Sequence, residues 1–460
     1  MLPTTALRQA ASFFPALGGD LPTIVRAEGI YLYDDAGRRL IDAAGGVGAV
    51  TSIGHAVPEV VEAIAAQLRT VAFVPWTQFQ SEPAQRLAEL VAETTPRGLN
   101  AVALFNSGSE VTEGAVKLAR QHWLAQGKAD KHLVVSRWQG FHGMSLGASG
   151  FSGHTQRRRK YQPMIHDMPK IGPAYAYRCE DCAAGSLRCA DELERVIRWH
   201  GPENVSCFIA EPVVGATMGA VPAPPGYFQR IREICDRYEV LFIADEVMCG
   251  FGRSGRWFAI EHWDVVPDIL VAAKGVSGGY APLALLIAHE RVVNALRAAG
   301  TPWVMGHTYA QNPVTAAAGL AVLDYIQRHD LVRAAEERGA QLLSGLQGLI
   351  GRHRILGDAR GLGLLLGLEL VQDRATREPF PLEAGMAFRF ARACVDEGVA
   401  VYPGQSGADG LIGDHALVTP PLVVSRDQVD ELVAAIDRAL SRLEADPTPS
   451  SADGRQKSSP

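Results

Sequence analysis

The 460-residue sequence lacks any run of about 18 uncharged apolar residues, the length that a membrane-spanning helix requires. Residues 1–20 carry one arginine and no long apolar core of the signal-peptide kind, so we expect a cytoplasmic protein without a membrane partner. The chain also lacks a basic excess, because 44 Lys and Arg stand against 50 Asp and Glu. The net charge of -6 disfavours nucleic acid as a partner and leaves small molecules as the favoured ligands.

Cysteine is scarce as well, and seven in a chain of this length do not make a disulfide scaffold. Four of them lie in apolar strand or helix patterns, where a buried thiol is ordinary: Cys207, Cys235, Cys249 and Cys394. The other three, Cys179, Cys182 and Cys189, share one loop-like segment, and a CxxC pair has metal-ligand spacing. His200 could add a fourth ligand, but a second matched pair is missing. We expect free thiols in a loop insertion and no metal.

Short apolar runs alternate with helix-length segments through the first two thirds of the chain. The runs are residues 101–105, 132–136, 205–210, 240–244 and 268–273. Such a pattern predicts a parallel sheet that helices cover on both faces. Val111, Ala115 and Leu118 have helical spacing after Ser107, and residues 226–238 form a second amphipathic pattern. We therefore predict a large α/β domain.

The pattern of apolar residues changes after about residue 328. An amphipathic helix is expected at 331–350, a strand at 361–370 and a closing helix at 426–443, which together predict a smaller α+β domain. The early segment 29–46 has hairpin character, with Asp35 and Gly37 in the turn, and could join that domain in space. The predicted limits are 1–59 for the N-terminal segment, 60–325 for the large domain, 326–444 for the small domain and 445–460 for a disordered tail.

Polar or glycine-rich residues follow each of the five runs, at the strand ends where open parallel sheets bind ligands. Lys274 directly follows the run 268–273 and precedes a glycine-rich opening. Burial there would lower its pKa and make the amine a nucleophile toward a carbonyl carbon. The alternative is a lysine that ends a strand at the surface.

Asp245 ends the preceding strand, where a carboxylate could keep the pyridine nitrogen of pyridoxal phosphate (PLP) protonated. It could instead cap a turn or pair with Arg253. For the adjacent Glu246 we expect no chemical role and pairing with a nearby base. The turn 106–110 offers Ser107, Gly108 and Ser109 as a phosphate cradle at a helix N-terminus, with a simple N-cap as the alternative.

At these residues the sequence resembles the class III (omega) aminotransferases of PLP fold type I, from about residue 20 to 443. The motifs that carry the likeness are NSGSE (106–110), FHG (141–143), EPVVGA (211–216), IADEVMCGFGRSG (243–255), KGVSGG (274–279), GHTYAQNP (306–313) and ARGLGLLLGLEL (359–370). The resemblance implies a mostly parallel, seven-stranded type of sheet sandwiched by helices in the large domain. It also implies a small domain built from both chain ends.

By this likeness, Lys274 forms a Schiff base with PLP and Asp245 partners its ring nitrogen. Phe141 and Val247 would pack on the two faces of the cofactor ring. Gly108 and Ser109 would hold the phosphate, and the partner subunit would contribute Thr308, which implies a homodimer, with a tetramer as the larger alternative.

Two further side chains complete the predicted site. Glu211 matches a family glutamate on the substrate side of the cofactor, which can pair with a substrate-sensing arginine. His142 could line the site, although a histidine beside a glycine is at least as often structural. Residues near Val47 and Trp76 would set the amino donor, but Trp76 is as readily a core residue.

The implied reaction is ping-pong transfer of an amino group from a primary amine or omega-amino acid to a keto acid, either pyruvate or 2-oxoglutarate. Two departures bear on it. Val111 and Thr112 replace the usual Ala and Asn after the phosphate turn, and residues 402–424 contain no arginine for the keto-acid carboxylate. The carboxylate anchor is therefore unassigned. A racemase, an aminomutase or a lyase of the same class stays open as the alternative, as does a binding protein that has lost catalysis.

Overall fold

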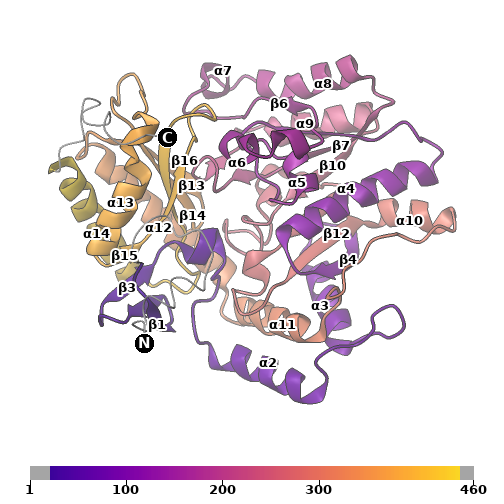
Figure 1. Ribbon diagram of the computed structural model, residues 1–460, viewed down its shortest axis with the longest axis horizontal. Coiled ribbons are helices and arrows are strands. Elements are labelled where there is room, and N and C mark those ends of the chain that lie inside the picture. The colour runs from indigo at the N-terminus through magenta and orange to yellow at the C-terminus, as the bar shows by residue number, and fades with distance from the viewer. Residues whose placement is uncertain (1–20, 446–460) are drawn as a thin grey trace, which may run out of the picture.

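A computed structural model describes residues 21–445 (Figure 1). Its centre is a seven-stranded sheet in the order β4-β12-β11-β10-β7-β5-β6, in which β12 alone runs antiparallel to both of its neighbours. The strands are β4 (Leu99–Phe105), β5 (Leu133–Arg137), β6 (Lys170–Ile171), β7 (Val205–Ala210), β10 (Leu241–Asp245), β11 (Ile269–Ala272) and β12 (Ala284–His289). The predicted fold class is confirmed.

Two strands of this sheet were not among the predicted runs. β6 is two residues long, too short to leave a periodic signal. β12 begins too soon after β11 for a parallel crossover, which needs a dozen or more residues, so the chain returns antiparallel instead.

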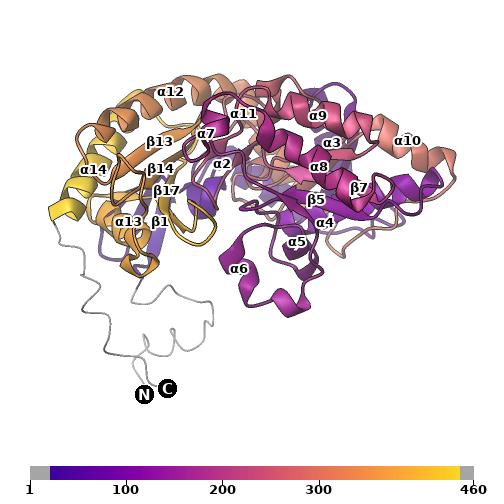
Figure 2. The same cartoon turned by 90° about the horizontal axis from the view of Figure 1, so that it is seen from above.

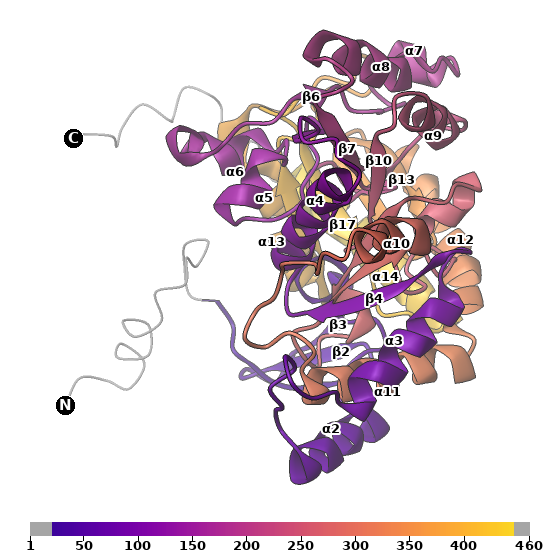
Figure 3. The same ribbon diagram turned by 90° about the vertical axis from the view of Figure 1, so that its right-hand side faces the viewer.

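Both faces of the sheet are buried, and the strand residues alternate between two hydrophobic clusters. Phe208 and Phe242 point to one cluster, whereas their neighbours Ile209 and Ile243 point to the other. The covering helices are α2 (Pro58–Thr70), α3 (Glu82–Thr94), α4 (Gly108–Ala125), α8 (Arg188–His200), α9 (Tyr227–Arg237), α10 (Glu290–Ala298) and α11 (Pro313–Arg328). Of these, α2, α3 and α11 pack together beside β4 (Figure 3). The helix-like patterns at 108–118 and 226–238 are confirmed as α4 and α9.

Short elements line the connections of the large domain. They are η1 (Gly45–Ala49), α5 (Leu146–Gly150), α6 (Thr155–Arg159), η2 (Gln162–Met164), α7 (Glu180–Ala183), β8 (Val213–Val214), β9 (Val221–Pro222), η3 (Ala259–Trp263) and η4 (Lys274–Val276). Many of them follow the carboxyl ends of the central strands, so they border the predicted site.

Both ends of the chain build the smaller domain, as predicted (Figure 2). The N-terminal hairpin is confirmed, because β2 pairs antiparallel with β3 and β3 pairs in parallel with β15. The elements are β1 (Ile24–Glu28), β2 (Tyr31–Asp34), β3 (Arg39–Asp42), α12 (Leu331–Ile350), β13 (Leu356–Leu362), β14 (Leu365–Leu370), η5 (Leu382–Ala384), α13 (Met386–Asp396), β15 (Val399–Ala400), β16 (Tyr402–Gln405), β17 (Asp414–Val418) and α14 (Arg426–Ala445).

The single strand predicted at 361–370 is wrong. The segment turns at Gly363, so that its first residues end β13 and its last six form β14 of an antiparallel pair. Gly363 has a φ of +54°, and a Cβ there would lie 2.4 Å from the carbonyl carbon of Ser254. A side chain is therefore excluded at this turn. The turn is not apparent in the sequence, because leucines surround the glycine.

None of the helices within residues 21–445 combines the length and apolar character that a bilayer crossing demands. The cytoplasmic location and the four domain limits stay predictions. Apart from Ala445, which ends α14, the predicted tail 445–460 lies outside the described residues.

Candidate active site

A cavity of about 200 Å³ lies where the carboxyl ends of the central strands meet. All of the predicted site residues except Thr308 line it: Ser107, Gly108, Ser109, Phe141, His142, Glu211, Asp245, Val247 and Lys274. They come from five separate strand ends, as the placement of polar residues after the apolar runs predicts.

Lys274 enters the cavity two residues after β11 and opens η4. Its φ of +50° is a left-handed conformation that costs energy for a residue with a Cβ, and it occurs at the residue whose side chain reaches the cavity. Burial lowers the pKa of the Lys274 amine below its ordinary value, and the charge of Asp245 offsets only part of that effect. The amine therefore has the depressed pKa that a nucleophile or proton acceptor requires.

Asp245 ends β10, next to β11 in the sheet, and only 2% of its surface is exposed. Its Oδ1 accepts a hydrogen bond from the backbone N–H of Val247 at 3.0 Å, and its Oδ2 lies 2.7 Å from His142 Nδ1. Pairing with Arg253 does not occur, because that guanidinium donates to the carbonyl oxygens of Leu364 and Pro420. The carboxylate is thus oriented by an imidazole and a turn.

His142 links two acids within the site. Its Nε2 lies 3.8 Å from Glu211 Oε2, on the side away from Asp245. Burial by itself lowers the pKa of His142, but the charges of Glu211 and Asp245 outweigh it and raise that pKa above its ordinary value. His142 therefore lines the cavity and contacts both acids, whereas the alternative from the sequence was a purely structural histidine.

Glu211 is held from two sides. Its Oε1 accepts from the backbone N–H of Phe141 at 2.9 Å, and its Oε2 lies 3.6 Å from Nη2 of the buried Arg137. Within residues 21–445, neither Glu211 Oε2 nor His142 Nε2 has a hydrogen-bond partner, although both atoms are buried. Buried polar atoms without partners are rare in proteins, and here they adjoin a cavity that a polar ligand can enter.

The turn before α4 has the form of an anion cradle. Ser107 is the N-cap residue, and its hydroxyl accepts from the backbone N–H of Glu110 at 3.3 Å. The N–H groups of the first helical turn have no helical carbonyl to bind, so a phosphate suits this position. Space is tight around it, since a Cβ on Gly108 would lie 3.2 Å from the Val247 side chain and one on Gly143 would lie 2.5 Å from Ser109 Oγ.

Thr308 lies outside this cavity. It lines a separate surface hollow together with Phe73, Trp76 and Met305, and Trp76 Nε1 donates to the carbonyl of His307 at 3.2 Å. Trp76 is therefore absent from the cavity of its own chain, and Val47 is 71% exposed. The expectation that residues near Val47 and Trp76 set the amino donor stays a prediction.

The family model for class III aminotransferases matches residues 18–440. The chain belongs to this family.

Several relatives of this aminotransferase align with it over nearly the whole length of both chains. An uncharacterised aminotransferase of Bacillus subtilis (strain 168) is 38% identical over 433 residues, which cover 94% of this chain and 97% of that protein. The putrescine–pyruvate aminotransferase of Pseudomonas aeruginosa is 32% identical, with 92% of this chain and 91% of that protein covered. The taurine–pyruvate aminotransferase of Bilophila wadsworthia is 34% identical, with 95% of each covered.

Solved structures agree with this assignment. A transaminase from the marine bacterium Virgibacillus superposes with a TM-score of 0.89 at 33% identity, covering 96% of this chain and 99% of that one. A PLP-bound amine transaminase from an uncultivated Pseudomonas species superposes with a TM-score of 0.87 at 33% identity, covering 94% and 98%. The protein is a transferase enzyme with the fold of PLP transaminases.

One residue near the site of this aminotransferase was not predicted. The guanidinium of Arg157, in α6, lies 4.6 Å from the ring centroid of Phe141, and its Nη2 is 3.5 Å from Tyr402 Oη in β16. No carboxylate of the described residues pairs with it. Three consecutive arginines occupy 157–159, and nothing in the sequence distinguishes which of them approaches the site.

The expectation for Glu246 is wrong in one respect. The side chain is fully buried and pairs with no base of residues 21–445; its two oxygens accept from the backbone N–H groups of Ala259 and Ile260, at 3.0 and 2.7 Å. Burial raises the pKa of Glu246 to about 8. The residue therefore anchors η3 beneath the site and does not line the cavity.

Proposed function

We propose that this aminotransferase transfers an amino group from a primary amine or omega-amino acid to a keto acid such as pyruvate or 2-oxoglutarate, with PLP as its cofactor. One observation carries the proposal: an amine with a lowered pKa and a buried carboxylate occupy adjacent strand ends of a cavity whose third wall is a helix N-terminus. Aldehyde, ring nitrogen and phosphate are the three groups by which PLP can be held, and the cavity offers a partner for each.

Lys274 would hold the cofactor, and Asp245 would face its ring nitrogen. Bound PLP supplies an electron sink for the carbanion that forms at the substrate carbon. Lys274 Nζ would take the proton from this carbon as a base and then, as an acid, deliver it to the C4′ carbon of the cofactor. Asp245 would be oriented by its contact with His142, and the N–H groups at the start of α4 would hold the phosphate end in place.

A homodimer completes this proposal, with Thr308 reaching the phosphate of the partner's site. The support is an exposed apolar surface around the hollow that contains Thr308: Phe79 is 60% exposed, Tyr309 62% and Val304 75%. Isolated chains rarely expose such a group of large apolar side chains, whereas a dimer interface buries them.

We also propose that Arg157 binds the carboxylate of the keto acid, in place of the arginine that residues 402–424 lack. Its guanidinium lies over the ring of Phe141, and no acid of the described residues pairs with it. Substituting Arg157→Met should raise the KM for pyruvate by about 10- to 100-fold, as expected when a hydrogen bond to a charged group is lost. The exposed Arg159→Met variant is the matched control. An unchanged KM in Arg157→Met would disprove this assignment.

Purified protein reconstituted with PLP tests the main proposal. Candidate amines should bleach its visible absorption one by one, and product should then accumulate only when a keto acid is present. The Lys274→Ala variant should lose activity by at least about 10³-fold. Product formation without any keto acid would instead establish a racemase, an aminomutase or a lyase.

A further inference from the structure

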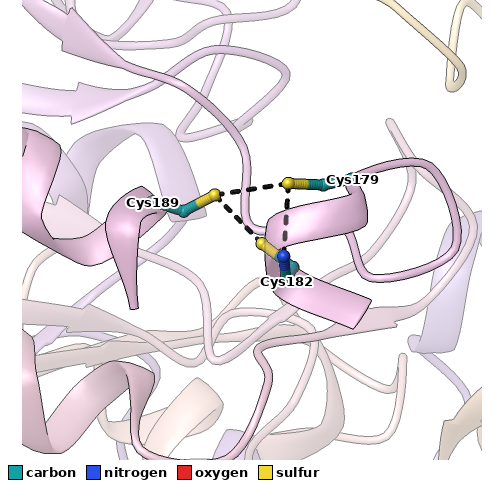
Figure 4. Close-up of side chains that lie close together, drawn as sticks. All are labelled: Cys179, Cys182 and Cys189. Carbon is teal, nitrogen blue, oxygen red and sulfur yellow. Dashed lines mark hydrogen bonds between the residues drawn. The ribbon is translucent and has the colours of Figure 1, made fainter. Parts of the chain in front are cut away.

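Three cysteine side chains lie close together in the large domain (Figure 4), and none of them lines the cavity. Cys179 immediately precedes α7, Cys182 lies within it, and Cys189 lies in the first turn of α8. Their sulfur atoms all lie within 4.8 Å of one another. The sequence predicted free thiols in a loop insertion, which gives no reason for three sulfur atoms to lie so close together.

The three sulfur atoms lie close enough together to share one ion. A tetrahedral Zn²⁺ with bonds of about 2.3 Å holds two sulfur ligands about 3.8 Å apart. In the structure, Sγ of Cys189 lies 3.6 Å from that of Cys179 and 3.0 Å from that of Cys182. The 3.0 Å separation is shorter than about 3.8 Å, so binding of one ion requires a rotation that moves the sulfur atoms of Cys182 and Cys189 apart.

The backbone supports this arrangement. The N–H of Cys182 points to Cys179 Sγ at 3.4 Å, which favours a thiolate at that sulfur. Cys182 is buried, whereas Cys179 and Cys189 are half-buried, so an ion held by the three keeps one side open toward solvent.

The predicted fourth ligand, His200, is ruled out by its position. It ends α8, eleven residues after Cys189, which places it about 16 Å away along the helix. No histidine or carboxylate of residues 21–445 joins the three sulfurs as a further ligand. A cluster that requires four cysteines is therefore disfavoured, and a solvent molecule remains for the fourth position.

We propose that Cys179, Cys182 and Cys189 bind one Zn²⁺ ion as thiolates, with water as the fourth ligand. Three thiols lose their protons to solvent and three Zn–S bonds form, without any change of oxidation state. Soft thiolates select such an ion over Mg²⁺ or Ca²⁺. The proposal does not depend on the transaminase reaction.

The ion would have a structural effect at the junction of the two domains. Arg178, directly before Cys179, donates to Glu369 of β14, and Arg377 of the small domain donates to the carbonyl of Tyr177. Zn²⁺ would join α7 to α8 and thereby hold this connecting segment in place. Its removal should lower the thermal midpoint of unfolding and leave the turnover of the folded enzyme unchanged.

The test is the zinc content of the full-length holoenzyme, purified under reducing conditions without chelators and incubated with equimolar Zn²⁺. After gel filtration, elemental analysis should find about one zinc per wild-type chain. Cys182→Ser and the more exposed Cys179→Ser should each retain less than about a tenth of that amount. Cys235→Ala, which removes a buried thiol of α9, is the matched control and should bind zinc normally.

Cobalt provides a second measurement that is independent of variant stability. Co²⁺ added to the metal-free wild type should give an intense thiolate-to-cobalt band in the near ultraviolet, and Zn²⁺ should displace it. Two results would overturn the proposal: wild-type protein free of zinc after the incubation, or a Cys182–Cys189 disulfide that forms in place of metal binding and is detected by mass spectrometry after alkylation. Equal zinc in wild type and both serine variants would overturn it as well.

Discussion

Two buried carboxylates of this enzyme, Asp245 at the end of β10 and Glu369 in β14, are each only 2% exposed, but their surroundings differ. Glu369 accepts from Tyr175 and from Arg178, and Arg360 pairs with the same carboxylate at 2.7 Å. Asp245 accepts from one backbone N–H and from His142, whose other ring nitrogen has no partner among the described residues.

This difference separates a structural cluster from a functional one. The saturated acid joins the segment before α7 to β13 and β14, and so connects the two domains. The acid in the cavity retains unsatisfied neighbours, which a ligand can satisfy. Burying either carboxylate costs free energy, but only at Asp245 can a bound ligand complete the hydrogen bonding of the surrounding groups.

The largest effect should come from Asp245→Asn. An amide preserves the contact with the Val247 N–H but removes the charge, so we expect kcat for the amine half-reaction to fall by about 10²- to 10⁴-fold. The thermal midpoint should stay near that of the wild type. Stopped-flow absorbance and a melting curve measure the two quantities. Activity within about threefold of wild type would erase the contrast between the two acids.

Glu369→Gln should produce the opposite pattern. It removes the buried counter-charge of Arg178 and leaves Arg360 with the half-buried Asp358, and breaking such a buried pair typically costs about 3–5 kcal/mol of unfolding free energy. Urea denaturation should reveal this loss, whereas kcat per folded molecule should be unchanged at low temperature. If a fully folded variant were inactive, the junction would have to be counted as part of the catalytic machinery.

Position along the chain made Asp245 and Lys274 candidates for one edge of the sheet, and the resemblance to the aminotransferases supplied their predicted roles. Asp245 and Lys274 each follow an apolar run, and parallel strands bring such residues to one edge of a sheet whatever the details of packing. The N-cap Ser107 was readable for a similar reason, since capping depends on residues close in sequence.

The parts that were missed depend on contacts between distant segments. The bond from His142 to Asp245 joins residues 103 positions apart, and the route of the loop after β5 decides which side chain turns inward. Arg157 approaches Phe141, and Arg159 does not, because of the way α6 packs. The hairpin at Gly363 was not predicted, because the glycine is required by the close approach of the Ser254 backbone and not by any hydrophobic pattern in the sequence.

The smallest effect should come from Glu246→Gln, which examines a third buried acid, one that has two backbone donors and no cation. Burial raises its pKa from 4.5 to about 8, so between these pH values the folded chain retains a proton that the unfolded chain releases. Stability should therefore fall as pH rises from 4.5 to 8, by at most about 1.4 kcal/mol per pH unit from this group.

The glutamine variant has no such proton, so its thermal midpoint should depend less on pH than that of the wild type. Its single acceptor oxygen cannot satisfy the N–H groups of both Ala259 and Ile260, which should cost about 1 kcal/mol near pH 5. Because the wild type loses up to about 1.4 kcal/mol per pH unit, its stability should fall to that of the variant about one pH unit above pH 5 and lie below it from there to pH 8, with activity within about twofold throughout. Parallel curves would mean that the two backbone donors keep Glu246 ionised even in this fully buried position, and that a carboxylate can be saturated without any positive charge.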